Sequence, residues 1–167
     1  MKKIITLLFV ATLVFTSCEG PEGPPGPPGY DGAVAEFFET TVNFNSANEF
    51  SQLIPIPDNI EISDFDVLQV YLLWGQDNNG NDIWRALPQT RQLDQGDLIY
   101  NFDYTIADVN LFLEAADFDL NTLLPGDTQN QVFRIAIIPS YQAKNMDLSN
   151  MDQVMKAANI KSIQKLN

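Results

Sequence analysis

Leu98-Ile99-Tyr100-Asn101-Phe102-Asp103-Tyr104-Thr105-Ile106 is the stretch that decides the fold class. Hydrophobic residues stand at every second position, and Asn101, Asp103 and Thr105 alternate with them. Successive side chains of a β-strand point to opposite faces, so this alternation predicts a strand with one buried face.

Other segments of the chain also have the composition of strands. Residues 67–74 and 132–138 are hydrophobic at consecutive positions, which predicts strands in the interior of a sheet. Residues 53–57 contain Pro55 and Pro57, which cannot donate ladder hydrogen bonds, so this strand is expected at an edge. Further strands are predicted near residues 83–87 and 109–113. The first strand of the domain is predicted where hydrophobic and polar residues alternate: Phe38, Val42 and Phe44 with Glu39, Thr41 and Asn43.

The connections between these strands predict the architecture. Residues 75–82 are expected to form a hairpin, because Asn79-Gly80 readily takes the positive φ that such turns need. Seven or eight short strands punctuated by turns predict an all-β fold over residues 34–167, an antiparallel β-sandwich of immunoglobulin-like shape. The 134 residues from 34 to 167 are enough for a single hydrophobic core and too few for two, so we predict one domain.

One short helix is expected near the end of the chain. Ser149 is the predicted N-cap, with Asp152 three residues on, and a hydrophobic stripe follows at helical spacing: Met151, Val154, Met155 and Ala158. The stripe is expected to cover the core, and a surface that binds a partner is the alternative.

The first seventeen residues have the layout of an export signal. Lys2 and Lys3 are followed by a hydrophobic run over residues 4–15 and by small residues that end at Cys18. The run is shorter than the ~20 residues of a membrane-spanning helix. A cysteine at this place resembles the lipobox of bacterial lipoproteins, which implies cleavage before Cys18 and its lipidation, with palmitate among the acyl chains. An ordinary secreted protein and an uncleaved anchor are the alternatives.

Glycine occupies every third position from Gly20 to Gly32, with Pro-Pro pairs between them. Collagen needs this spacing, because only glycine fits at the axis of the triple helix. As a single chain, residues 18–33 would form an extended stalk in which residues 19–32 span ~40 Å, and we favour this spacer over a homotrimer.

Composition excludes several kinds of function. The chain has no histidine and one cysteine, so lipidation of Cys18 leaves no thiol, and the commonest general base is absent. Removal of Lys2 and Lys3 with the signal takes the net charge from −13 to −15. Such a charge argues against a nucleic-acid partner. We therefore expect no enzyme activity, cofactor or metal site.

Three groups of residues are candidate sites. Trp74 and Trp84, together with Tyr71 and Tyr100, could form an aromatic platform for glycans or peptides, although packing in the core is the alternative. Residues 77–82 resemble part of a calcium loop, but Asp82 and Pro88 stand where the glycine and the bidentate glutamate should be, so a plain hairpin is favoured. The acid pairs of a possible glycosidase are interpreted as solvated loop residues: Asp64/Asp66, Asp94/Asp97 and Asp117/Asp119.

The whole layout resembles collagen-like lipoproteins of Gram-negative bacteria. The resemblance rests on Cys18, on the Gly-Pro-Pro triplets, and on the stretches over residues 83–90, 100–105 and 131–134. That group is of unknown function, so the resemblance implies an outer-membrane placement and no catalytic residues. The sequence thus predicts a lipoprotein that presents a non-catalytic domain with a structural or interaction role, facing the periplasm or the cell surface.

Overall fold

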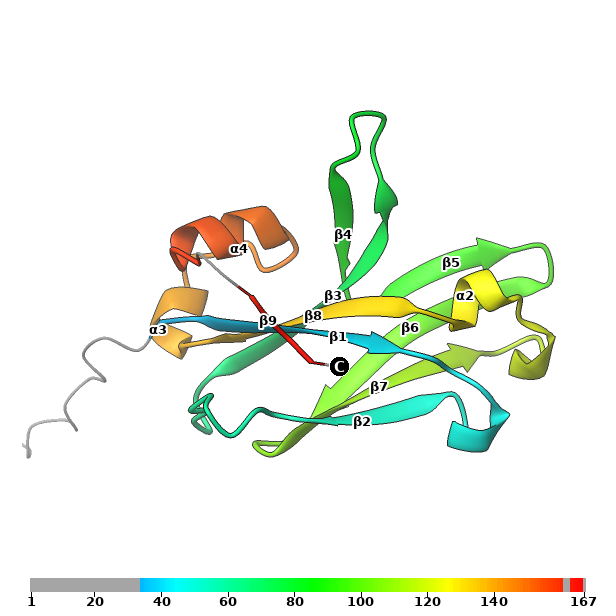
Figure 1. Ribbon diagram of the computed structural model, residues 1–167, viewed down its shortest axis with the longest axis horizontal. Coiled ribbons are helices and arrows are strands. Elements are labelled where there is room, and N and C mark those ends of the chain that lie inside the picture. The colour runs from blue at the N-terminus through cyan, green and yellow to red at the C-terminus, as the bar shows by residue number, and fades with distance from the viewer. Residues whose placement is uncertain (1–33, 161–162, 167) are drawn as a thin grey trace, which may run out of the picture. The chain divides into compact units, whose positions relative to one another are not determined.

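The computed structural model describes residues 34–160 and 163–166. Cys18, the signal segment and the collagen-like stretch lie outside the described residues. The described part is mostly β: a five-stranded sheet packs on a four-stranded sheet, and a few short helices accompany them (Figure 1). No helix within the described residues is both long enough and apolar enough to span a membrane.

The five-stranded sheet has the order β4-β3-β8-β1-β9. Its strands are β1 (Glu36–Val42), β3 (Val67–Gln76), β4 (Asp82–Ala86), β8 (Gln131–Ile138) and β9 (Gln164–Lys165). The four-stranded sheet has the order β2-β7-β6-β5, with β2 (Ser51–Pro55), β5 (Gln89–Leu93), β6 (Gly96–Tyr104) and β7 (Asp108–Ala115). Neighbouring strands are antiparallel except β9, which pairs parallel with β1.

Short helical segments complete the described chain. Two 3-10 turns, η2 (Ser46–Asn48) and η3 (Leu120–Thr122), lie in loops. The α-helices are α2 (Pro125–Thr128), α3 (Ser140–Ala143) and α4 (Met151–Ala157). The sequence predicted α4 alone, so α2 and α3, which are four residues each, were missed.

The main core lies between the two sheets. The five-stranded sheet contributes Phe38, Val70 and Ile135, and the four-stranded sheet contributes Leu98 and Leu111, all of them fully buried. This arrangement confirms the central placement predicted for residues 67–74 and 132–138, because β3 and β8 each have a neighbour on both sides. The edge placement predicted for the strand with Pro55 is also confirmed, since β2 pairs only with β7.

A second hydrophobic cluster covers the other face of the five-stranded sheet. Phe37 and Tyr71 of the sheet pack with Met151, Val154 and Ala158 of the α4 segment. The predicted stripe therefore does cover the core. The N-cap is Asn150 rather than Ser149: the Asn150 side chain accepts a hydrogen bond from the Gln153 amide, whereas the Ser149 hydroxyl donates to Asp147.

This outer layer corrects the predicted half-buried character of β1. Alternation placed Glu39 toward solvent, yet only 8% of Glu39 is exposed, because the α4 segment covers the outer face and β9 lies beside β1 in the sheet. The predicted strand through residues 98–106 also ends early. Tyr104 is 46% exposed, and Ile106, at 61%, lies in the β6–β7 turn, where the Thr105 hydroxyl bonds to Asp108.

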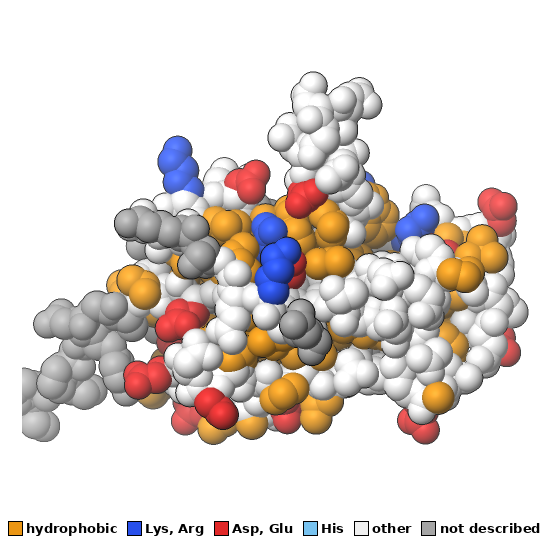
Figure 2. Space-filling view, viewed as in Figure 1, with side chains coloured by type: hydrophobic (Ala, Val, Ile, Leu, Met, Phe, Trp, Pro, Cys, Tyr) orange, Lys and Arg blue, Asp and Glu red, His pale blue; other side chains and the backbone are white. Residues whose placement is uncertain are grey.

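The β3–β4 hairpin forms as predicted and rises from the five-stranded sheet (Figure 1). Gly80 has a φ of 81°, while Asn79 keeps a negative φ. The tip is held by the Asp77 carboxylate, which accepts hydrogen bonds from the Asn79 and Asn81 amides. Acidic side chains are spread over the face of the molecule in Figure 2, and hydrophobic ones gather at the base of this hairpin.

Candidate functional site

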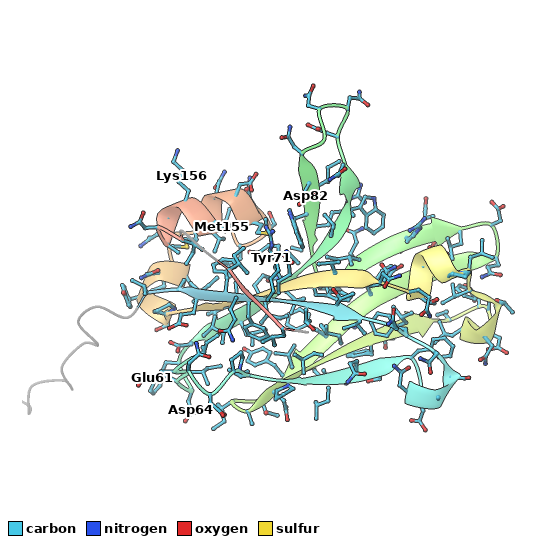
Figure 3. All side chains as sticks on the ribbon, viewed as in Figure 1. Glu61, Asp64, Tyr71, Asp82, Met155 and Lys156 are labelled. Carbon is cyan, nitrogen blue, oxygen red and sulfur yellow. The ribbon has the colours of Figure 1, made fainter. Side chains whose placement is uncertain are left out.

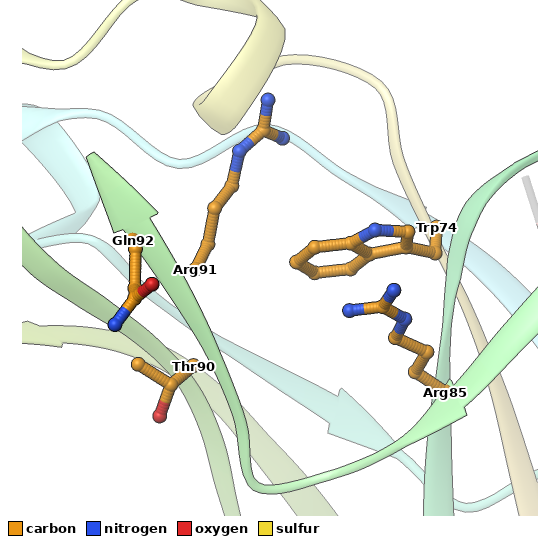
Figure 4. A pocket seen from close by; sticks show the side chains of 5 residues that line it. All are labelled: Trp74, Arg85, Thr90, Arg91 and Gln92. Carbon is orange, nitrogen blue, oxygen red and sulfur yellow. The ribbon is translucent and has the colours of Figure 1, made fainter. Parts of the chain in front are cut away.

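The crossing from one sheet to the other creates a cleft around Trp74. β4 belongs to the five-stranded sheet and β5 to the four-stranded sheet, and only Leu87 and Pro88 separate them. Arg85 on β4 and Arg91 on β5 therefore approach Trp74 from two different sheets (Figure 4). Two of the three arginines of this acidic chain meet at one indole.

Strand register explains why Arg85 faces the cleft. Arg85 pairs with Leu72, whose side chain is buried in the core between the sheets, so both point to the inner side of the five-stranded sheet. Trp74 lies two residues along the same face of β3. The Arg85 guanidinium carbon is 4.1 Å from the Trp74 ring centroid, a close cation–π contact.

The cleft has a volume of about 560 Å³ and is open to solvent. Its lining consists of Trp74, Arg85, Thr90, Arg91 and Gln92. Within the described chain, the side chains of Arg85, Thr90 and Gln92 form no hydrogen bond or ion pair. The cleft therefore offers an aromatic edge and the guanidinium of Arg85, while Thr90 and Gln92 lie at its rim on the outer face of β5.

Arg91 differs from Arg85 in having an acidic partner. Its Nη1 is 3.1 Å from Oδ1 of Asp127, whose side chain is 8% exposed, and its guanidinium carbon is 5.7 Å from the Trp74 ring centroid. The Tyr100 hydroxyl donates to the Asp127 carbonyl at 2.9 Å. Asp127 thus largely neutralises Arg91, whereas no acidic side chain of the described residues compensates Arg85.

Trp84 lies on the opposite face of the same sheet. It packs against the cluster under α4, and the Arg134 guanidinium carbon is 3.9 Å from its ring centroid. Arg134 Nε donates to Glu39 at 2.9 Å, and Lys165 Nζ lies 2.8 Å from the other oxygen of that carboxylate. Burial disfavours ionisation of Glu39, but the bonds from Lys165 and Arg134 outweigh it and lower its pKa.

The four aromatic residues considered from the sequence are thus not gathered at one place. Tyr71 and Tyr100 are fully buried, and the Tyr71 hydroxyl donates to the Leu148 carbonyl at 2.8 Å. Burial, with the nearby Asp147 charge second, raises the pKa of Tyr71. Trp74 and Trp84 are only partly buried, but they lie in separate clusters on the two faces of the sheet.

The acid pairs lie on the surface, apart from the cleft lining. Five of the six residues are exposed, and Asp66 is half-buried and accepts a hydrogen bond from the Ser63 amide. Asp64 lies on the loop before β3 (Figure 3). Bonds from Asn81, first among several, lower the pKa of Asp77 in the hairpin. Among the described residues, no three acidic side chains are grouped closely enough to hold a metal ion.

Trp74 was a predicted site residue, whereas Arg85 and Arg91 were not predicted from the sequence. Two signals pointed to them: arginine is rare in this acidic chain, and Arg85 directly follows Trp84 in the strand. Neither signal tells which tryptophan each arginine contacts, because the answer depends on the pairing of β3, β4 and β5.

Comparison with protein-family models, with curated proteins and with solved structures finds no match for this chain.

Proposed function

We propose that this chain is an exported lipoprotein whose β domain is a non-catalytic binding module held at the outer membrane by a lipid on Cys18. The ligand is a glycan or a peptide, and nucleic acid is disfavoured by the net charge of −13. The collagen-like segment acts as the spacer between membrane and domain. The resemblance to collagen-like lipoproteins of Gram-negative bacteria supports this placement.

One observation carries the binding role: Arg85 is stacked on Trp74 in an open cleft and has no acidic partner among the described residues. Arginines that only stabilise a fold are commonly paired with carboxylates, as Arg134 is with Glu39. An arginine oriented by an aromatic ring, with its N–H groups directed to solvent, is prepared to bind an external acceptor.

The chemistry of the lining favours binding over catalysis. It contains guanidinium, hydroxyl, amide and indole groups and lacks a carboxylate, thiol or imidazole. General acid–base catalysis and nucleophilic catalysis need such groups close to the bound substrate.

Array screening of the whole chain, purified from membranes in non-ionic detergent, tests the binding role. We expect reproducible glycan or peptide hits that are lost in Trp74→Ala, because the indole orients Arg85. Trp84→Ala is the matched control, since Trp84 lies on the other face, and it should keep the hits. Binding that survives Trp74→Ala would contradict the proposed site, and turnover of a bound glycan would favour an enzyme.

Metabolic labelling with palmitate tests the anchor. We expect label on the wild-type chain and none on Cys18→Ala, which should also leave the membrane fraction, since two or three acyl chains are needed for firm anchoring. An unlabelled wild type, or label that persists in the variant, would refute lipidation at Cys18.

The immunoglobulin-like shape is part of the same proposal. It is supported by the nine strands that residues 34–160 and 163–166 divide between two packed sheets, the number found in the variable-type version of that fold.

A further inference from the structure

We propose that the cleft around Trp74 binds a carboxylated sugar of an acidic glycan, with Arg85 as the residue that holds the carboxylate. This inference rests on the binding role proposed above and specifies the class of ligand.

Arg85 carries a positive charge that no acidic side chain of the described residues compensates. Arg91 is compensated by Asp127 at 3.1 Å, and Arg134 by Glu39 at 2.9 Å, so Arg85 alone among the three arginines lacks an acidic partner in the described chain. The Arg85 side chain is exposed and lies against the indole, 4.1 Å from the ring centroid. A planar guanidinium held in this way presents its edge to a carboxylate, with which it can form two parallel hydrogen bonds.

The rest of the molecule is strongly acidic and repels anionic ligands. The chain has a net charge of −13, which repels anions over most of the surface. At physiological salt this repulsion is screened beyond ~8 Å, so a cation in direct contact with the ligand dominates locally. A carboxylate is therefore directed to the Trp74 cleft rather than to the surrounding surface.

The cleft is also lined by three uncharged residues, Trp74, Thr90 and Gln92. Thr90 and Gln92 lie at the rim of the cleft, on the face of β5 opposite Arg91, where their hydroxyl and amide can donate and accept hydrogen bonds, as sugar hydroxyls require (Figure 4). Arg85 lies over the face of the Trp74 ring, so the indole offers the ligand its edge rather than a free ring face. The lining contains no aliphatic side chain, whereas peptide recognition by strand addition or in a helix groove uses pockets for side chains. The lining thus favours an acidic sugar over an acidic peptide.

Isothermal titration of the whole chain, in non-ionic detergent and without divalent cations, tests this assignment. The probes are polygalacturonate, the same polymer with all carboxyl groups methyl-esterified, and poly-glutamate. We expect binding of polygalacturonate and at least tenfold weaker binding of the other two. Arg85→Gln should weaken polygalacturonate binding at least tenfold, or about 1.4 kcal/mol. Arg85→Lys should weaken it less, because the charge remains while the planar fork is lost.

Lys156→Gln is the matched control. It removes one positive charge from the exposed side of α4 and should leave binding unchanged (Figure 3). Equal binding of the esterified polymer would overturn the acidic ligand while the binding role stands, and equal binding of poly-glutamate would overturn the sugar. Unchanged binding in Arg85→Gln would overturn the role of Arg85. If neither these probes nor any array ligand binds, the inference and the proposed function both fail.

Discussion

Replacing Glu39 by glutamine should remove the ionic link that runs across the outer face of the five-stranded sheet. In the strand register Glu39 of β1 lies opposite Arg134 of β8 on one side and Lys165 of β9 on the other. The Arg134 guanidinium also lies over the Trp84 ring of β4, and its Nη1 is 3.9 Å from Sδ of Met151 on α4. One carboxylate therefore joins three strands beneath the helical layer.

The cost follows from the exposure of the two partners. The Arg134 side chain is 18% exposed, so loss of its charged hydrogen bond at 2.9 Å should cost about 1.5–3 kcal/mol. Lys165 is 72% exposed, and its bond at 2.8 Å should contribute at most ~1 kcal/mol. Glutamine keeps one acceptor, so we expect Glu39→Gln to lower the free energy of unfolding by about 2–3 kcal/mol, and the Tm by roughly 10 °C.

Urea unfolding of the wild type and of Glu39→Gln, followed by circular dichroism from pH 7 to pH 3, measures this difference. The pKa of Glu39 is lower in the folded than in the unfolded protein. Its contribution is therefore complete above the unfolded value of about 4.3 and is lost as the pH falls through the folded pKa. Glu36→Gln is the control on the same strand. A difference below 0.5 kcal/mol at pH 7 (about the scatter of surface substitutions), or one unchanged at pH 3, would refute the reasoning.

Three further predictions concern the core and the stalk. Burial, with the Asp127 charge second, raises the pKa of Tyr100 to about 12, so the wild type should lose stability as the pH rises from about 10 to 12. Tyr100→Phe should cost about 1 kcal/mol at pH 7 and reduce this alkaline loss in urea titrations, while Tyr71, whose pKa is also raised, keeps part of it; an unchanged slope would contradict the assignment. Val154→Ala should lower the free energy of unfolding, measured by thermal unfolding, by about 2 kcal/mol, because Val154 is fully buried. Lys156→Ala on the exposed side of α4 should leave it unchanged, and equal effects of the two variants would show that α4 does not cover the core. In sedimentation, the chain with and without residues 19–32 should have the same oligomeric state, and a trimer only in the longer form would establish the stalk as a trimerising element.

The strands that contribute most to the core were predictable, because short runs of hydrophobic residues in the sequence indicate their burial. β3 and β8 are hydrophobic at consecutive positions and lie inside a sheet with cover on both faces. β5 was missed because Gln89-Thr-Arg-Gln-Leu93 is polar at most positions, as an edge strand can be when it pairs only with β6. β9 has two residues and gives no periodic signal.

The candidate site was predictable only in part. Trp74 was named for its chemistry, but so was Trp84, and the sequence offered no reason to separate them. The pairing of β3 with β4 places Trp84 beneath the helical layer with Arg134 and Arg85 against Trp74, and the crossing to β5 brings Arg91 to the same indole.

By itself, the sequence determined the β class, the central strands and the lack of histidine, because strand periodicity and composition are local properties. The tertiary structure alone decided which face each tryptophan occupies and which arginine has no carboxylate partner among the described residues. Those properties depend on contacts between residues far apart in the chain, such as Glu39 with Arg134 and Arg91 with Asp127. No local pattern encodes such contacts, since they arise only when the two sheets pair and pack.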